Sequence, residues 1–365
     1  MTKKIKTIAV MTGGGDCPGL NAVIRAVTKT AISKYKLNVW GIEDGYLGLI
    51  ENRIRPLTYD DVSDILTIGG TILGSSNLAN PFKYATKTKA GKIRRTDVSD
   101  KCVANLKARN IDALICIGGD GTMASATDFA KKGVTIMGVP KTIDNDLPCT
   151  DFTFGFDTAV TTATEAIDKL HTTASSHHRV MIVEVMGRYA GWIALHAGIA
   201  SGSDVILIPE IPYNLRKVCA FVLERSHRGK RFSIIVVSEG AKEVGGQMIV
   251  KEKLKHSPDP IRLGGIASKL VQDIEKEVGL DCREVTLGHI QRGGTPTAFD
   301  RALATGLGFK AIDLLSKGVK NHLVVFKDGK YSSVPLKSIA GRIKTVPKNH
   351  PLINAARGVN TSFGI

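Results

Sequence analysis

Short apolar runs alternate along the chain with segments whose apolar residues recur at helical spacing. The spacing i, i+3, i+4, i+7 predicts a helix with one buried face, as at Leu20, Val23, Ile24, Val27 and Ala31. The apolar runs predict buried strands at Ile8–Met11, Val39–Ile42, Ala113–Ile117, Val134–Val139, Val180–Val185, Val205–Ile208, Ile234–Val237, Val285–Leu287 and Leu323–Phe326. Alternating strands and helices are typical of α/β proteins with largely parallel sheets.

The number of predicted strands is too large for one small sheet. The chain has 365 residues, of which 43% are hydrophobic, and this length is enough for two domains of ordinary size. We therefore expect the α/β fold class with two similar three-layer lobes. In such sheets ligands bind beyond the carboxyl ends of the strands.

Composition and charge argue against some classes of partner. The formal net charge of +16 would suit nucleic acid, but aromatic residues make up only 5% of the chain and no recognisable nucleic-acid motif accompanies the basic runs. We expect no nucleic-acid partner and assign part of the charge to a site for small anionic ligands. No apolar stretch approaches the ~20 residues that span a bilayer, and the first residues carry no cleavage site, which predicts a cytoplasmic protein without a membrane partner. The six cysteines form no metal-binding or disulfide pattern.

Two glycine-rich turns follow predicted strands. In "MTGGGDCPGLNAVIRAV" the third glycine of a dinucleotide fingerprint is replaced by Pro18, so the turn favours phosphate binding through backbone N–H groups instead. In "ICIGGDGTMASA", Asp120 follows two glycines, where a carboxylate can hold Mg²⁺ beside a polyphosphate. Kinases of NAD, lipids and sugars share "GGDGT", and all three classes remain open at this point. The chain has no GxxxxGK[ST] sequence, which excludes a P-loop kinase.

A third segment, "GVPKTIDNDLP", places Lys141, Asp144 and Asp146 directly after a predicted strand. Phosphoryl transfer to an alcohol needs a carboxylate that accepts the hydroxyl proton and cations that stabilise the moving phosphoryl group. The alternative is that the Asp-Asn-Asp sequence only forms turns through its own side chains.

Two more segments each join an arginine flanking a strand to a glycine turn that carries another arginine. The pairs are Arg179 with Arg188 and Arg283 with Arg292. We expect all four at ligand-facing strand ends, where guanidinium groups hold phosphate oxygens bidentately.

Together these segments resemble the motif set of 6-phosphofructokinases. The matching stretches run in order from about residue 8 to residue 305: "GGGDCPGLNAVIR", "DGYLGL", "GGTILGSS", "IGGDGT", "PKTIDND", "TFGFDTA", "VEVMGRYAGWIAL" and "LGHIQRGGTPTAFDR". The resemblance implies a glycolytic enzyme that transfers a phosphoryl group to the 1-hydroxyl of fructose 6-phosphate, with its active site in a cleft between two α/β domains.

The resemblance also implies roles for individual residues. Asp144 matches the catalytic base, with Thr142 beside it, and Arg188 matches the arginine that steadies the transferring phosphoryl group. The donor site is implied at Gly15, Gly119, Asp120, Gly121, Thr122 and Lys141, with Asp120 also holding Mg²⁺. The sugar-phosphate site is implied at Thr142, Asp144, Arg179, Met186, Gly187, Arg188, Glu239, Arg283, His289 and Arg292.

Arg179 and Arg283 match arginines that reach the phosphate of a neighbouring subunit. A homodimer or homotetramer with active sites completed across an interface is therefore implied. The implied domains are residues 1–154 plus about 290–345, which bind nucleotide and Mg²⁺, and residues 155–289 plus about 346–365, which bind sugar phosphate.

The phosphoryl donor depends on two markers that disagree. Pyrophosphate users of this family commonly carry a carboxylate after the "GGD" aspartate, whereas Gly121 leaves the space of a nucleotide α-phosphate open. Lys141 resembles the pyrophosphate marker, but a lysine can bind either polyphosphate, while an added carboxylate would repel ATP. We therefore expect ATP as the donor, with a pyrophosphate-dependent enzyme as the alternative and a NAD or lipid kinase as the remote one.

Overall fold

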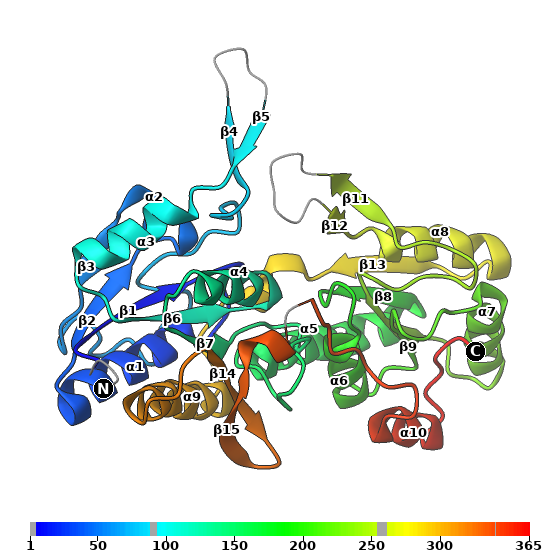
Figure 1. Ribbon diagram of the computed structural model, residues 1–365. Helices are drawn as coiled ribbons and strands as arrows, with labels where there is room; N and C mark the ends of the chain where they lie inside the picture. The colour runs from blue at the N-terminus through cyan, green and yellow to red at the C-terminus, as the bar shows by residue number, and fades with distance from the viewer. Residues whose placement is uncertain (1–4, 88–92, 254–260, 340) are drawn as a thin grey trace.

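A seven-stranded sheet with the order β15–β14–β7–β6–β1–β2–β3 forms the first lobe of the computed structural model (Figure 1). The structure describes residues 5–87, 93–253, 261–339 and 341–365. Neighbouring strands from β14 to β2 are parallel, and the two outermost strands are antiparallel to their neighbours. The strands are β1 (Thr7–Thr12), β2 (Asn38–Ile42), β3 (Ile54–Pro56), β6 (Ala113–Gly118), β7 (Ile136–Pro140), β14 (His322–Lys327) and β15 (Lys330–Pro335).

Helices cover both faces of this sheet because its central strands are apolar on both sides. In β1, Ile8 and Val10 pack into one apolar cluster with α1 and α9, whereas Ala9 and Met11 pack into another with α2, α3 and α4. Successive strand residues point to opposite faces, so a continuous apolar run serves two layers. The helices are α1 (Leu20–Tyr35), α2 (Tyr46–Glu51), α3 (Ser99–Ala108), α4 (Asp120–Lys131) and α9 (Ala298–Ser316).

The second lobe is built on a four-stranded sheet of order β13–β8–β10–β9. Every pair of neighbours in it is parallel. Its strands are β8 (Val180–Val185), β9 (Val205–Leu207), β10 (Ser233–Ser238) and β13 (Cys282–Thr286). Its helices are α5 (Phe156–His177), α6 (Trp192–Ala200), α7 (Leu215–His227), α8 (Ile266–Val278) and α10 (Pro351–Gly358).

The two lobes share one apolar layer. Residues of α1 and α9 from the first lobe and of α5 and α6 from the second belong to a single buried cluster. The opposite face of the second sheet packs on α7 and α8 in a cluster of its own. The predicted α/β class with largely parallel sheets in two lobes is confirmed.

Two hairpins project above the lobes in Figure 1, and the sequence did not predict them. One is β4 (Tyr84–Lys87) with β5 (Ile93–Thr96), and the other is β11 (Val250–Lys253) with β12 (Ile261–Leu263). Their strands are only three or four residues long and each contains a basic residue, so they lack the apolar run of a buried strand. The basic stretch "KTKAGKIRR" falls on the first hairpin and lies partly outside the described residues.

The C-terminal part of the chain contributes strands or contacts to both lobes. β14 and β15 lie on one edge of the first sheet, next to β7. The chain then continues through the short helix η2 (Leu336–Ser338) to α10, and its last residues reach the second lobe. There Ser362 pairs with Val205 of the edge strand β9, and the carbonyl of Ser362 accepts a hydrogen bond from the Ile206 N–H.

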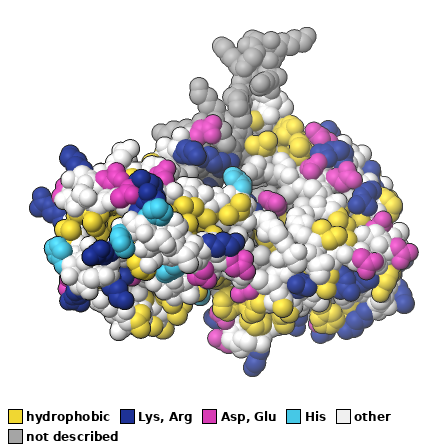
Figure 2. All heavy atoms as spheres, turned by 180° about the vertical axis from the view of Figure 1, so that it is seen from behind, with side chains coloured by type: hydrophobic (Ala, Val, Ile, Leu, Met, Phe, Trp, Pro, Cys, Tyr) yellow, Lys and Arg dark blue, Asp and Glu magenta, His cyan; other side chains and the backbone are white. Residues whose placement is uncertain are grey.

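Charges of both signs are distributed over the surface. On the face shown in Figure 2, Lys and Arg side chains are interspersed with Asp and Glu and do not gather into one basic stripe. All six cysteines are free, and only Cys149 is not buried. Among the described residues, no helix is both long enough and apolar enough to span a membrane.

The first turns of α5 and α9 hold the two lobes together by reciprocal hydrogen bonds. Asp300 of α9 is fully buried and accepts bonds from the Thr158 N–H at 2.8 Å and the Thr158 hydroxyl at 2.6 Å. In return, the hydroxyl of Thr297 donates to Asp157 of α5 at 2.6 Å. Acceptors at a helix N-terminus satisfy backbone N–H groups that have no partner within the helix.

Asp300→Ala is expected to lower the free energy of unfolding by about 2–4 kcal/mol, because it leaves two buried donors of Thr158 unsatisfied. Urea titration followed by circular dichroism measures the change. Asp168→Ala, at an exposed position of α5, is the matched control. Equal stability of the two variants would contradict this role of Asp300.

Candidate active site

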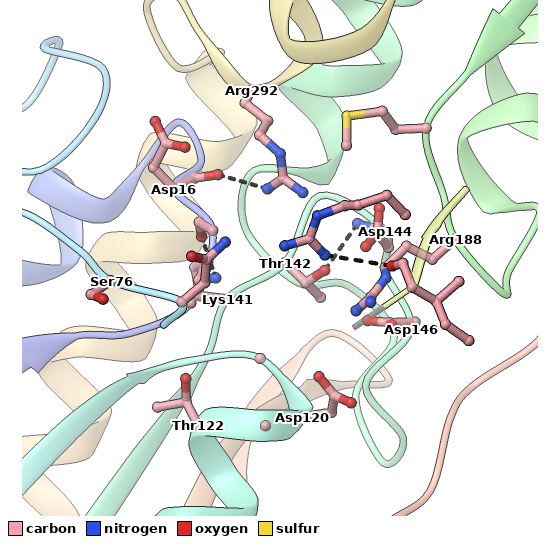
Figure 3. A pocket seen from close by; sticks show the side chains of 18 of the residues that line it. Asp16, Ser76, Asp120, Thr122, Lys141, Thr142, Asp144, Asp146, Arg188 and Arg292 are labelled. Atoms are coloured by element: carbon pink, nitrogen blue, oxygen red, sulfur yellow. Dashed lines mark hydrogen bonds between the residues drawn. The ribbon is translucent and has the colours of Figure 1, made fainter. Parts of the chain in front are cut away.

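A cavity of about 440 Å³ lies at the carboxyl ends of the parallel strands and takes residues from both lobes. The turns after β1, β6 and β7 contribute Gly15, Asp120 and Asp144 from the first lobe. The turns after β8 and β10 contribute Arg188 and Glu239 from the second. Figure 3 shows Asp120, Asp144, Asp146 and Arg188 facing one space. The cavity between the lobes therefore brings together Asp120, Lys141, Asp144, Arg188 and Arg292 from among the side chains that the sequence singled out.

The glycine turn after β1 needs its glycines for two reasons. Gly14 has a φ of +81°, a conformation that disfavours residues with a Cβ. A Cβ at Gly15 would lie 2.6 Å from Nη1 of Arg292. The same Nη1 donates to the carbonyl of Asp16 at 3.0 Å, so Arg292 packs directly over the turn. The turn thus lies next to a guanidinium group, while the N–H groups of Gly13 and Gly14 donate to the carbonyls of Ile117 and Ser76.

Lys141 reaches the same turn from the end of β7. Its side chain is buried, and its ammonium donates to the carbonyl of Gly15 at 2.5 Å. Burial lowers the pKa of this lysine, and nearby Arg292 lowers it further. An ammonium carries three donors, and Gly15 accepts from one of them. Lys141 can therefore support the turn and contact a bound phosphate at the same time.

Asp144 is held in the turn that follows Lys141. Its N–H donates to the hydroxyl of Thr142 at 3.1 Å, and the next residue, Asn145, has a φ of +50°. The carboxylate oxygen Oδ1 of Asp144 is buried without a hydrogen-bond partner. Burial raises the pKa of Asp144, while Arg292 and Arg188 oppose the rise. Asp144 lines the cavity, where a carboxylate can accept a proton from a bound hydroxyl.

Two further carboxyl groups crowd this space. Burial, and then the charge of Asp144, raises the pKa of Asp146 to about 7. The same two causes, in the same order, raise the pKa of Glu239 to about 7. Like charges in a partly dry site oppose each other's ionisation. The site is therefore electrostatically suited to bind a cation.

Asp120 begins α4 on the other side of the cavity, followed by Gly121 and Thr122. Among the described residues, no group of three or more His, Cys, Asp or Glu side chains forms a preformed metal centre. Mg²⁺ does not require one, because it usually binds one or two carboxylates together with substrate phosphates and water. Asp120, with Asp144 and Asp146 on the facing wall, fits that mode of binding (Figure 3).

Gly121 is open to the cavity. A Cβ at this position would meet no atom within 4 Å, and the backbone is not in the left-handed region. A larger side chain would therefore enter the cavity without straining the loop. A Cβ at Gly119 would meet one atom within 4 Å, the carbonyl oxygen of Lys141 at 3.4 Å.

Arg188 is placed by Glu239. The N–H of Arg188 donates to Oε1 of Glu239 at 3.0 Å, and Arg188 has a φ of +50°. Gly187, with a φ of +143°, has no space for a Cβ, which would lie 2.5 Å from the carbonyl oxygen of Ala190. Met186 and His289 line the cavity, whereas Gly187 supports it from behind.

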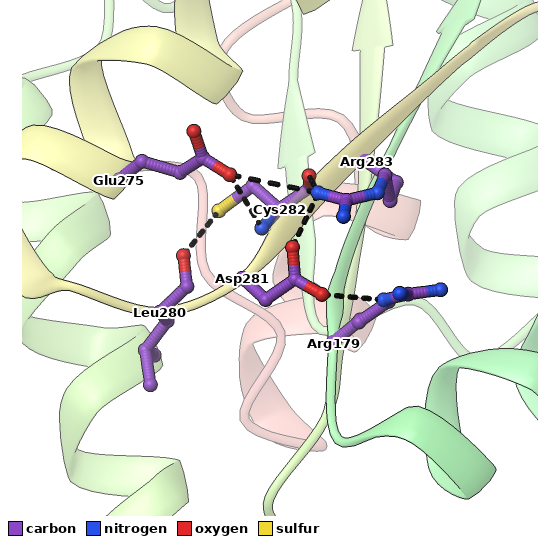
Figure 4. Close-up of polar contacts among 6 residues, drawn as sticks. All are labelled: Arg179, Glu275, Leu280, Asp281, Cys282 and Arg283. Atoms are coloured by element: carbon purple, nitrogen blue, oxygen red, sulfur yellow. Dashed lines mark hydrogen bonds and ion pairs between the residues drawn. The ribbon is translucent and has the colours of Figure 1, made fainter.

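Arg179 and Arg283 do not line the cavity, and the prediction that they lie at ligand-facing strand ends is wrong. Arg179 precedes β8, whose six residues span about 20 Å before the cavity is reached. Arg283 lies near the start of β13, which begins earlier than the predicted strand because an edge strand needs fewer apolar residues. Both arginines pair with Asp281, Arg179 through Nε at 2.5 Å (Figure 4).

The structure adds cavity residues that sequence reasoning missed. Beyond Gly121 the wall is formed mainly by small or uncharged side chains, and one more arginine reaches the cavity from β12. Single serines, alanines and asparagines in loops carry no chemical signal, and the position of β12 depends on tertiary structure. These residues are Tyr46, Ser76, Asn77, Ala79, Asn80, Ser125 and Arg262.

Comparison with known proteins identifies relatives over the whole chain. The family model described as Phosphofructokinase matches residues 7–315. "ATP-dependent 6-phosphofructokinase 2" of Clostridium perfringens is 54% identical over 364 residues, covering 100% of both chains. "ATP-dependent 6-phosphofructokinase" of Mycobacterium tuberculosis is 47% identical and covers 94% of this chain and 96% of its own. "Pyrophosphate--fructose 6-phosphate 1-phosphotransferase" of Streptomyces coelicolor is 48% identical, with 93% and 96% covered.

Solved structures show the same fold. The T-state phosphofructokinase of Pichia pastoris superposes with a TM-score of 0.77 at 33% identity. That match covers 93% of this chain but only 36% of the longer yeast chain. The pyrophosphate-dependent phosphofructokinase of Nitrosospira multiformis has a TM-score of 0.79 at 22% identity, which shows likeness of fold alone.

Proposed function

Because the chain belongs to the phosphofructokinase family, a family of phosphotransferase enzymes, we propose that it is an ATP-dependent 6-phosphofructokinase. It transfers the γ-phosphoryl group of MgATP to the 1-hydroxyl of fructose 6-phosphate, giving fructose 1,6-bisphosphate and ADP. The observation that carries the proposal is the convergence of Asp144, Arg188, Lys141 and Asp120 on one cavity. The NAD and lipid kinases that share "GGDGT" have no counterpart among the relatives reported above.

Asp144 acts as the base in this proposal. A sugar hydroxyl is a poor nucleophile at neutral pH, so the proton must leave as the bond to phosphorus forms. The carboxylate of Asp144 accepts that proton, and the bond between the γ-phosphorus and the bridging oxygen of ADP breaks. Thr142 holds the Asp144 backbone, which keeps the carboxyl group directed at the cavity.

The cations of the cavity stabilise the transferring group. Arg188 and Lys141 lie on opposite sides of the base and contact phosphoryl oxygens, where negative charge accumulates. Asp120 holds Mg²⁺, which supplies positive charge to the donor phosphates when bound. His289 and Arg292 bind the 6-phosphate, while Met186, Gly187 and Glu239 place the sugar.

ATP is favoured as the donor by the part of the cavity beyond Gly121. Tyr46, Ser76, Ala79 and Ser125 also line the cavity, and their side chains are uncharged. This space suits a nucleoside attached to the phosphates. Pyrophosphate remains the second candidate, because Lys141 contacts the phosphate turn and one relative at 48% identity is named for that donor.

The proposal extends to the domains and the assembly. We propose domain boundaries at 1–154 plus about 290–345 and at 155–289 plus about 346–365. The return of β14 and β15 to the first sheet and of Ser362 to the second supports them. We further propose a cytoplasmic homodimer or homotetramer in which Arg179, half-buried before β8, and Arg283, exposed on the edge strand β13, complete the 6-phosphate site of a neighbouring subunit.

Asp144→Asn is expected to lower kcat by about 10²–10⁴-fold, with a smaller change in KM for fructose 6-phosphate, since the lost interaction exists mainly in the transition state. A coupled assay of ADP formation measures both constants, and circular dichroism confirms folding. A folded variant with kcat near that of the wild type would remove Asp144 from the role of base.

Gly121→Asp tests the donor. The new carboxylate enters open space and repels the α-phosphate of ATP, at a cost on the order of several kcal/mol at an intermediate dielectric constant. Activity with ATP should collapse, while activity with pyrophosphate is kept or rises, because pyrophosphate has no α-phosphate. Gly121→Asn, similar in size but uncharged, is the control. ATP-dependent activity at the wild-type level in Gly121→Asp, or a wild type that prefers pyrophosphate, would contradict the proposal.

Arg179→Ala and Arg283→Ala should each weaken binding of fructose 6-phosphate more than binding of ATP, because a lost charge-assisted contact costs about 1.5–3 kcal/mol. Mixing either variant with Asp144→Asn should restore activity through hybrid sites. Isothermal titration and assays of the mixed subunits provide the measurements. Unchanged sugar-phosphate affinity in both variants would refute the shared site.

A further inference from the structure

Residues 341–350 form a connecting segment without helix or strand between η2 and α10. In Figure 1 this segment runs from beside β14 to α10 in the second lobe. The backbone N–H of Val346 donates to Oε1 of Glu210 at 2.8 Å, and the same oxygen accepts from the Gly191 N–H at the start of α6. The connecting segment is thereby fixed to the second lobe.

Lys344 joins this connecting segment to the turn that carries the proposed base. Its ammonium donates three hydrogen bonds, to Oδ1 of Asn145 at 3.0 Å and to the carbonyls of Thr150 at 2.9 Å and Asp151 at 3.0 Å. Its backbone N–H donates to the carbonyl of Asp146 at 2.7 Å. We call residues 142–151 the base-bearing turn. Lys344 therefore uses all of its hydrogen-bond donors on this turn.

Lys344 also contacts the second lobe. Its carbonyl accepts a bond from Nε1 of Trp192 at 2.9 Å, and its ammonium lies 5.3 Å from the centre of the Trp192 ring. Trp192 is the first residue of α6, directly after the turn that holds Arg188. Lys344 thus lies between the base-bearing turn of one lobe and the arginine-bearing turn of the other.

The base-bearing turn needs such external contacts. Asn145, between the two aspartates, has a left-handed backbone that is unfavourable for a residue with a Cβ. Asp144 and Asp146 carry like charges on either side of it, and burial followed by the charge of Asp144 raises the pKa of Asp146. The amide of Asn145 supplies an internal bond to the Asp151 carbonyl at 3.2 Å, and its Oδ1 accepts from the Thr153 N–H.

The charge of Lys344 also suits this place. Burial lowers the pKa of its ammonium to about 8, while Asp151 and then Asp146 oppose the change. All three of its side-chain acceptors are neutral oxygens, so the positive charge is not neutralised by a direct ion pair with them. The ammonium therefore stabilises the turn both by hydrogen bonds and by attraction to its carboxylates.

We propose that Lys344 is a positioning residue, which holds the base-bearing turn, residues 142–151, in the shape that directs Asp144 at the substrate hydroxyl. The inference rests on the proposed function for the role of Asp144. The inference that Lys344 restrains the turn does not depend on the proposed function. Lys344 itself does not line the cavity, so it acts through Asn145 and the backbone.

The test compares Lys344→Met with Lys348→Met, which changes an exposed lysine of the same connecting segment. Amide hydrogen exchange in peptides covering residues 142–153 should accelerate by about tenfold or more in Lys344→Met, because three hydrogen bonds are lost. kcat should fall by about tenfold to a hundredfold, with KM for both substrates within about threefold. Lys348→Met should match the wild type in both measurements, and Lys344→Arg should recover part of kcat.

Each other outcome counts against the inference. Unchanged exchange in the turn overturns the restraint, and faster exchange with unchanged kcat overturns the effect on the base. A proportional loss of kcat and of folded protein would assign Lys344 a merely structural role. If Lys344→Met does not fold, Lys344→Gln, which keeps two donors, decides by the same measurements. Should the wild type not phosphorylate fructose 6-phosphate, the proposed function fails, and the exchange experiment still decides whether Lys344 restrains the turn.

Discussion

The concentration of carboxyl groups opposite cations in one partly buried cavity is the constraint on which the rest of this structure depends. Asp144, Asp146 and Glu239 share a small space, and their raised pKa values reflect burial and mutual repulsion. Such groups can face one cavity only if the chain supplies cations and rigid backbone around them. Lys141 and Arg292 supply the cations, and both contact the glycine turn after β1.

The two-lobe architecture provides the rigidity that this arrangement requires. Parallel sheets direct the turns of several strands to one edge, and a shared apolar layer keeps the two edges face to face. Two sets of hydrogen bonds add to the contact that this apolar layer makes between the lobes. Asp300 links the first turns of α9 and α5, and Lys344 links the base-bearing turn to α6. The cavity is thus held from behind by residues that do not take part in chemistry.

Much of the fold and of the site could be predicted from the sequence. Continuous apolar runs identified the buried strands, because a strand covered on both faces needs apolar residues at every position. Glycine turns with Asp120, Lys141, Asp144 and Arg188 identified the cavity, because parallel strands bring their carboxyl ends together. The short hairpins, the early start of β13 and the uncharged wall near Tyr46 were missed, since none has a periodic or chemical signal in one sequence.

The sequence by itself determined the α/β class, the family and the residues able to carry phosphoryl transfer, since these follow from local patterns of residue type. Only the tertiary structure decided which of these residues lie together in the cavity. It placed Arg179 and Arg283 away from the cavity and paired both with Asp281, although the sequence joined them through a strand to the glycine turns that carry Arg188 and Arg292. It also brought Lys344, almost 200 positions away in the chain, onto Asn145. Contacts between distant segments depend on how layers pack, and no local pattern encodes them.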